Sequence, residues 1–408
     1  MKMKKLSMLV AMAALTFSVN AQTLNVQSAI QDLKKNYLNK AKSEIDAACE
    51  HESTKGDAKT WLYKGLIYSR IGGEATNPKS KFKNLAPDWA EQAYAAALEC
   101  KRLDEKQEYA EENNSVFRFV GNEYYVRSTE LYNGQQYAEA MQYADKAIEM
   151  FTNTGDRKFS EEARYIAGIS AKALKDTENM KKYFNQMVRS KTNKNVVYRT
   201  LFNQYKEEGN KDKAMSTATS YMKNCKNDYN AYLLMAEGYL LNENLEKGKE
   251  MINQTLTMTK DSVTIYPKIL CLAAAILENT QDYEGAESKY RESMTLNPNQ
   301  FEANFGMGKM IFNRGVDKLD AANAVPLDDE TGLNEKLMSE SNDYFSQSIQ
   351  YFTSAIAYID ALPEAEKPMQ RANLYNCLNA LKTVYVRLER YDDLKPVNAR
   401  LDEIQKGL

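Results

Sequence analysis

Apolar and small side chains recur three and four positions apart along most of this chain, which predicts amphipathic α-helices. Between residues 195 and 297 the pattern also repeats with an offset of 34 residues. The aligned positions are Tyr205 with Tyr239, Gly209 with Glu243, and Ala214 with Gly248. A helix-turn-helix unit that returns at this period predicts an all-α solenoid, in which each helix pair packs on the next.

The same register extends in both directions and predicts about nine helix pairs between residues 22 and 408. The second pair opens with Trp61, Gly65 and Tyr68, whose spacing places them on one face of a helix. A glycine on such a face lets a neighbouring helix cross closely. We therefore expect Gly65 to be a packing position and Trp61 to contribute to the core.

Two segments interrupt the helical pattern. Residues 71–88 contain Gly72, Gly73 and two prolines, and residues 313–334 end in a polar run with a proline and a glycine. Because Gly and Pro disfavour helix interiors, both segments are expected to be inserted loops. Residues 333–362 contain neither, which predicts one long helix, and the charged segment 371–408 is expected to be a terminal capping pair.

Three motifs resemble those of the tetratricopeptide repeat (TPR) family. They are Trp61-x3-Gly65-x2-Tyr68, Tyr137-x2-Ala140-x6-Ala147, and Tyr283-x2-Ala286-x3-Tyr290 followed by Pro298. The resemblance covers nearly all of the chain after residue 21, and it implies a right-handed α-solenoid. In its tyrosine-rich and asparagine-rich character the chain is also similar to secreted TPR proteins of Bacteroidetes.

Residues 1–21 have the form of a secretory signal peptide, with three lysines before an apolar run and small residues before Gln22. The apolar run is too short to span a membrane well, and no cysteine follows it for lipid attachment. Cleavage after Ala21 removes three lysines and changes the formal net charge from −2 to −5. We therefore expect a soluble, exported, periplasmic protein of residues 22–408, without a basic stripe for nucleic acid.

The five cysteines are odd in number and widely spaced, so they define no disulfide framework. Cys49 and Cys100 each lie near the end of a second helix in neighbouring pairs. A bridge between them and two buried free thiols are both open interpretations. Cys271, inside an apolar run, is expected in the core.

The sequence lacks the residue clusters that most catalysis requires. His51 is the only histidine, so no histidine-based metal cage can form, and we predict no metal site, no cofactor and no enzymatic activity. The segment 306–309 lacks the strand and glycine spacing of a phosphate loop. The acidic run Asp328, Asp329 and Glu330 lacks the alternating ligands of an EF-hand and is expected to be a solvated charge run.

The TPR resemblance implies that an extended peptide or a helix binds the concave face lined by the first helix of each pair. The side chains expected on that face are Tyr125, Tyr132, Tyr165, Lys172, Arg199, Asn203, Lys206 and Asn230. Arg199, Asn203 and Lys206 are four and three residues apart and therefore share a helical stripe that could grip a carboxylate or a peptide backbone. Glutamates such as Glu162 and Glu237 fall on the same face. We expect a non-enzymatic exported scaffold that binds a peptide or protein partner.

The 27 tyrosines leave an alternative open, because their rings can stack on sugars. A glycan-binding or small-solute-binding protein of the cell envelope is therefore the second hypothesis. Most tyrosines fall in packing positions and the chain has only Trp61 and Trp89, which favours the scaffold.

Overall fold

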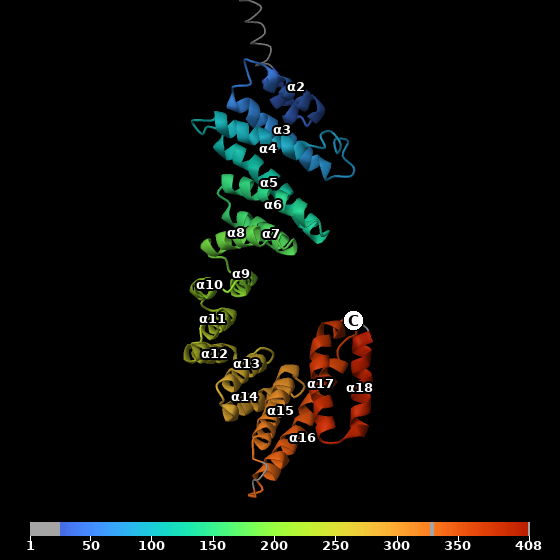
Figure 1. Cartoon of the computed structure of the whole chain (residues 1–408). Coiled ribbons are helices and arrows are strands. Elements are labelled where there is room, and N and C mark those ends of the chain that lie inside the picture. The colour runs from blue at the N-terminus through green and yellow to red at the C-terminus, as the bar shows by residue number, and fades with distance from the viewer. Residues whose placement is uncertain (1–24, 327–329, 407–408) are drawn as a thin grey trace, which may run out of the picture. The chain divides into compact units, whose positions relative to one another are not determined.

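The computed structural model describes residues 25–326 and 330–406, and every regular element within these ranges is a helix (Figure 1). The prediction of an all-α solenoid built from helix pairs is confirmed. By its internal contacts the chain divides into two compact units, residues 1–197 and residues 198–408, and each is described by itself. The predicted signal peptide, residues 1–21, lies outside the described residues.

The described part of unit 1, residues 25–197, contains four helix pairs. Helical residues 25–34 pack against α2 (Leu38–Glu50) through Val26, Ile30 and Ala48. The other pairs are α3 (Ala58–Ala75) with α4 (Trp89–Leu103), α5 (Ala110–Asn133) with α6 (Tyr137–Asn153), and α7 (Arg157–Ala173) with α8 (Thr177–Arg189). First helices of successive pairs also contact one another, α3 with α5 and α5 with α7. Side chains on α5 and α7 can therefore contact the same ligand.

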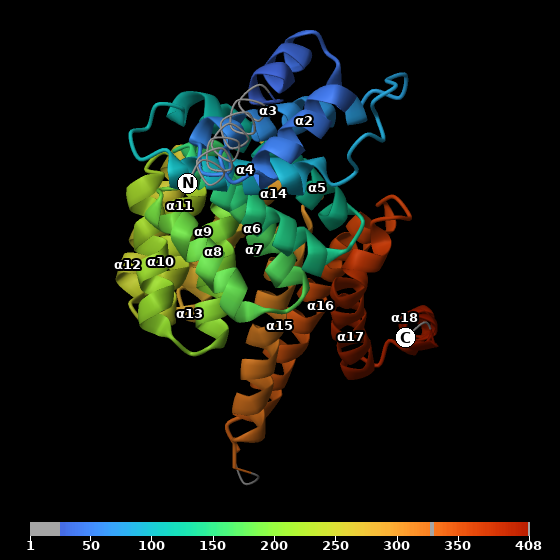
Figure 2. The ribbon, with the colours of Figure 1, turned by 90° about the horizontal axis from the view of Figure 1, so that it is seen from above.

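Unit 2 starts inside α9 (Asn195–Glu207) and continues through four more pairs. Its helices are α10 (Lys211–Asn224), α11 (Tyr229–Leu241), α12 (Leu245–Thr259), α13 (Tyr266–Asn279), α14 (Tyr283–Leu296), α15 (Phe301–Asn323), α16 (Leu333–Asp360), a short 3₁₀ turn (Lys367–Gln370), α17 (Arg371–Arg387) and α18 (Tyr391–Lys406). Figure 2 shows α15 and α16 side by side over a long distance. The long helix expected in 333–362 is confirmed, and α17 with α18 form the expected last pair.

The turns inside the pairs α7–α8, α9–α10, α11–α12 and α13–α14 share one local structure, which explains where the second helices begin. A residue in the left-handed region precedes an Asp or Asn that caps the next helix, as at Lys175 (φ 59°) before Asp176 and at Gly209 (φ 70°) before Asn210. The Asp176 carboxylate accepts a hydrogen bond from the Asn179 amide at 3.1 Å. Such caps satisfy amide groups that a helix start otherwise leaves unpaired.

Several glycines inside the helices mark close crossings, as expected for Gly65. A Cβ built on Gly65 would lie 3.2 Å from Val116 Cγ1. On Gly168 it would overlap the Phe184 ring, with 2.6 Å to Cδ1. Because Phe184 is fully buried, that ring has no open space to move into.

The first predicted insertion is shorter than expected. Residues 71–75 belong to α3, so only residues 76–88 leave the helical pattern. Gly72 is a packing position and not a loop residue, because a Cβ there would lie 2.6 Å from Trp89 Cε2. The remaining loop is anchored, since Phe82 is 8% exposed and belongs to the core cluster of unit 1.

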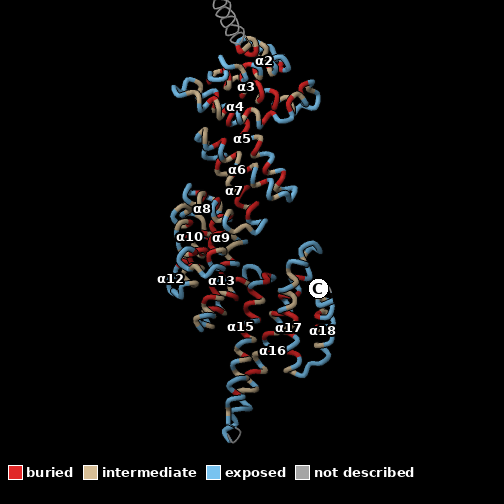
Figure 3. The backbone as a smooth tube through the Cα atoms, turned by 45° about the horizontal axis from the view of Figure 1, so that its top comes forward, coloured by how far each residue is buried: buried red, intermediate tan, exposed pale blue. Residues whose placement is uncertain are grey.

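The second predicted insertion, residues 313–334, is wrong over most of its length. Residues 313–323 continue α15, and the described residues outside both helices are only 324–326 and 330–332. Gly315, which lies inside the predicted insertion, faces Phe345 of α16, so it permits a close helix contact. In Figure 3 the buried residues of α15 and α16 lie where the pair is close to other helices. Toward the end of the pair that extends away from them, most residues are exposed. Asp328 and Asp329 lie outside the described residues.

Candidate partner-binding surface

Three of the predicted tyrosines lie on two contacting first helices of unit 1. Tyr125 and Tyr132 belong to α5 and Tyr165 belongs to α7, and all three are half-buried. Tyr125 and Tyr132 pack against the cluster formed by Ala144, Ile166, Ala167 and Tyr183. The apolar part of each ring is therefore fixed by the core, while another part reaches the surface. Tyr125, Tyr132 and Tyr165, with the exposed Lys172 at the end of α7, are called the tyrosine surface below.

The ring of Tyr165 has a charged neighbourhood. The Lys194 ammonium group lies 4.9 Å from the ring centroid, in the range of a cation–π contact. Lys194 also pairs with Glu162 at 3.1 Å, so its charge is already partly balanced. This part of unit 1 consequently combines an aromatic ring with charges of both signs.

In unit 2 the predicted cationic stripe is joined by one carboxylate of α11. Glu237 lies 3.6 Å from the Arg199 guanidinium and 2.9 Å from the Lys206 ammonium group. Asn203 lies between the two cations in the sequence and is exposed. The three charged groups together carry one net positive charge. The stripe therefore attracts an acidic ligand less strongly than it would if Glu237 did not neutralise part of its charge.

Asn230 is involved in local structure at the start of α11. Its side-chain amide donates a hydrogen bond to Asp228 Oδ1 at 2.9 Å, and its backbone amide donates to the same oxygen at 3.0 Å. Asp228 is the N-cap of α11. The side-chain amide of Asn230 therefore supports a helix start, and a ligand would have to compete with this contact.

Several other tyrosines hold their hydroxyl groups against carboxylates of neighbouring helices. The hydrogen-bonded pairs include Tyr68 with Asp46 (2.8 Å), Tyr94 with Glu149 (2.8 Å), Tyr183 with Asp145 (2.8 Å) and Tyr290 with Glu278 (2.7 Å). Burial raises the pKa of Tyr94 to about 12, and the hydrogen bond to Glu149 adds to the effect. These rings stabilise contacts between helices, which argues against interpreting the tyrosine content as a set of sugar-stacking platforms.

The remaining chemical candidates of the sequence have structural roles. All five cysteines are free, so the alternative of a Cys49–Cys100 bridge does not apply. His51 follows the end of α2, and its Nδ1 lies 2.8 Å from the Ser53 hydroxyl oxygen. Gly306 and Gly308 lie inside α15. Within the described residues no group of three or more metal-ligating side chains occurs, and no helix there is both long and apolar enough to cross a membrane.

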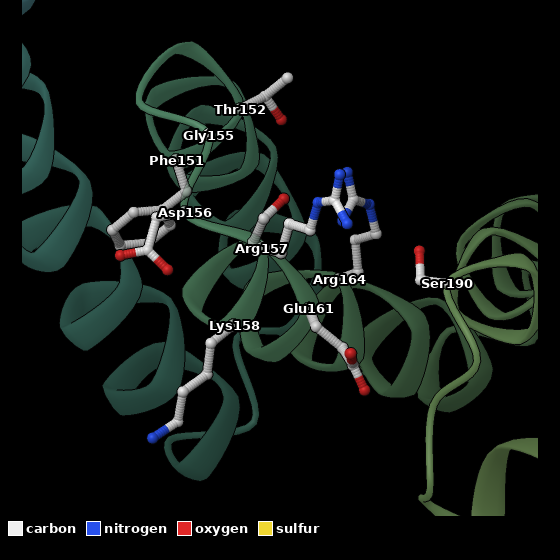
Figure 4. A pocket seen from close by; sticks show the side chains of 10 residues that line it. Phe151, Thr152, Gly155, Asp156, Arg157, Lys158, Glu161, Arg164 and Ser190 are labelled. Atoms are coloured by element: carbon white, nitrogen blue, oxygen red, sulfur yellow. The ribbon is translucent and has the colours of Figure 1, made fainter.

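One site in unit 1 is absent from the sequence-based expectations. A pocket of about 590 Å³ lies between the end of α6, the first two turns of α7 and Ser190 at the end of α8 (Figure 4). Arg157 and Arg164 line it. The sequence does carry a signal, because aligning Gly168 with Gly65 places Arg164 at the position of Trp61. In the second pair this position holds an aromatic ring, so the charged Arg164 departs from the repeat pattern.

The fold defines an all-α protein of stacked helix pairs, the arrangement that the TPR-like sequence motifs predict. No protein-family model and no curated protein matches the chain. Similar solved structures include MamA from Desulfovibrio magneticus, with 18% identity over 44% of this chain and 96% of that chain and a TM-score of 0.36. Another is YrrB, described as a TPR protein with an unusual peptide-binding site, with 12% identity, 55% and 92% coverage and a TM-score of 0.31. A thermophilic TPR protein of Thermus thermophilus matches at 14% identity, 47% and 98% coverage and a TM-score of 0.32. The likeness concerns the helix-pair fold alone.

Proposed function

We propose that this protein is a non-enzymatic, exported scaffold that binds a peptide or protein partner on the first helices of its pairs. In unit 1 the partner contacts the tyrosine surface of α5 and α7. In unit 2 the corresponding residues are Arg199, Asn203, Lys206 and Asn230. The observation that carries the proposal is the placement of half-buried tyrosines on two first helices that touch each other. Rings that the core already holds lose little conformational freedom when a partner covers them, so they suit binding.

The proposal is tested by removing one aromatic anchor and one cation of the tyrosine surface. The partner is the protein that crosslinks to the wild-type chain in periplasmic extract of its own host. We expect the variant Tyr165→Ala with Lys172→Ala to recover at least tenfold less of this partner. The measurement is quantitative mass spectrometry after affinity purification and crosslinking. The expected size follows from the loss of a packed aromatic contact, about 1.4 kcal/mol for each factor of ten.

A matched control comes from another tyrosine and lysine in contact. Tyr37 is 50% exposed, and the Lys40 ammonium group lies 5.8 Å from its ring centroid. The variant Tyr37→Ala with Lys40→Ala removes the same groups away from α5 and α7, and it should keep the partner. Equal recovery with both double variants, each shown to be folded by its thermal melt, contradicts the assignment of this surface.

Export is tested on the same preparation. We expect the protein in the periplasmic fraction to begin at Gln22, because the lysine-rich start, the apolar run and the small residues before Gln22 form a signal peptide. Intact-mass spectrometry measures this directly. A full-length chain confined to the cytoplasmic fraction would remove the export part of the proposal and leave the partner surface untouched.

A further inference from the structure

The Arg157–Arg164 pocket brings two guanidinium groups to the same space. The two residues are seven positions apart on α7, so they lie on one helical face. In Figure 4 both guanidinium groups point into the same part of the pocket, near Thr152 and Ser190. The Lys158 ammonium group and the Glu161 carboxylate point away from it in this view. Two like charges held together raise the free energy of the folded protein unless something of opposite charge joins them.

Two polar atoms of this pocket have no hydrogen-bond partner among the described residues. One is Nε of Arg164, which is buried. The other is the hydroxyl oxygen of Ser160, a residue that is only 3% exposed and lines the pocket. A buried polar group that makes no hydrogen bond costs stability, typically about 1–3 kcal/mol. Such groups are expected where a ligand completes the bonding.

The electrostatics of the pocket favour an anion. Burial lowers the pKa of Arg164, and the nearby Glu161 carboxylate only partly opposes this effect. A guanidinium nevertheless stays protonated at neutral pH. The pocket also lies at the N-terminus of α7, where unpaired backbone amides give a partial positive charge. The Asp156 carboxylate is already engaged there, because it accepts a hydrogen bond from the amide of Phe159 at 3.3 Å.

We propose that this pocket binds an oxyanion, with Arg157 and Arg164 as charged donors and the Ser160 hydroxyl as a third donor. The planar guanidinium group matches the paired oxygens of a carboxylate or a phosphate. A volume of about 590 Å³ exceeds that of a single inorganic ion, so the anionic group has room for an attached organic part. No residue of the tyrosine surface lines this pocket, and the inference stands independently of the proposed partner.

The test uses the mature protein and isothermal titration calorimetry with two probes, inorganic phosphate and succinate, against chloride of equal ionic strength. We expect at least one oxyanion to bind at a single site with an affinity that chloride does not match. Binding of phosphate alone identifies a phosphate-type ligand, and binding of succinate identifies a carboxylate. If neither probe binds in excess of chloride, the proposal is overturned.

Substitutions then locate the site. Arg157 and Lys158 are adjacent and both exposed, so Arg157→Gln and Lys158→Gln remove the same charge with little risk to folding. We expect Arg157→Gln to weaken oxyanion binding at least tenfold and Lys158→Gln to change it less than threefold. Ser160→Ala should weaken it severalfold. An equal loss in the Arg157→Gln and Lys158→Gln proteins would mean a general charge effect and would overturn the assignment.

Discussion

Replacing Gly168 by alanine should destabilise unit 1 by about 1–2 kcal/mol. The added methyl group would overlap the Phe184 ring, which is 0% exposed and therefore held on all sides. Overpacking of this kind costs about 1–3 kcal/mol, and alanine recovers up to about 1 kcal/mol through its better helix propensity. Chemical denaturation of the wild-type and variant proteins measures the difference in the free energy of unfolding.

The matched control is a second helical glycine. Gly73 lies in α3, and a Cβ there would meet only Phe119 Cζ, at 3.9 Å. Gly73→Ala should therefore be neutral or stabilising by up to about 1 kcal/mol. Combining Gly168→Ala with Phe184→Leu should cost less than the two single changes added together, because the smaller side chain makes room. If Gly168→Ala and Gly73→Ala behave alike, the close crossing of α7 and α8 is not the reason for Gly168.

The protein should lose stability steeply when the pH rises above about 9. Burial raises the pKa of Cys49, Cys100 and Cys377 from 9.0 to about 12, and that of Cys271 to about 11. A thiol whose pKa is higher in the folded state stabilises the fold fully below its unfolded pKa. This contribution disappears as the pH rises from about 9 to about 12, because the unfolded chain releases the proton first.

The slope of stability against pH gives the quantitative test. Each buried thiol contributes about 1.4 kcal/mol of loss per pH unit inside this window. Replacing Cys377 by alanine should cost stability at pH 8, through a cavity, and should also reduce the slope between about pH 9.5 and 11 by about that amount. Cys225, which is only half-buried, is the control, and Cys225→Ala should change the slope less. An unchanged slope in the Cys377→Ala protein would contradict the buried thiol as its source.

Much of the fold could be predicted because the helical repeat is a local property. The spacing of Trp61, Gly65 and Tyr68 depends on 3.6 residues per turn and on nothing distant. The two insertions were harder to predict, because Gly and Pro can stand either in a loop or within a helix. Gly72 suggested a loop and Gly315 falls inside the second predicted insertion, yet both lie in helices where an aromatic ring, Trp89 or Phe345, packs against the bare backbone. Only the partner ring distinguishes these cases.

The candidate binding residues, too, could be predicted from the sequence only in part. Helical spacing correctly placed Arg199 and Lys206 on one helix, but it could not say that Glu237 of α11 lies between their charges. It placed Asn230 on the expected first helix without revealing the capping contact with Asp228. The Arg157–Arg164 pocket was missed because its walls come from three helices that the repeat pattern treats separately.

The sequence by itself determined the helix period, the pairing of helices and the resemblance of the repeat to the TPR motif, since neighbouring residues decide them. It also determined that His51 is the only histidine, which limits the chemistry available. The tertiary structure decided which polar groups are satisfied. The Tyr68 hydroxyl donates to Asp46 and the Tyr290 hydroxyl donates to Glu278, whereas Arg164 Nε has no acceptor among the described residues. These outcomes depend on side chains brought together from different helices. Burial and charge pairing are long-range in the sequence, and they become fixed only when the helices pack.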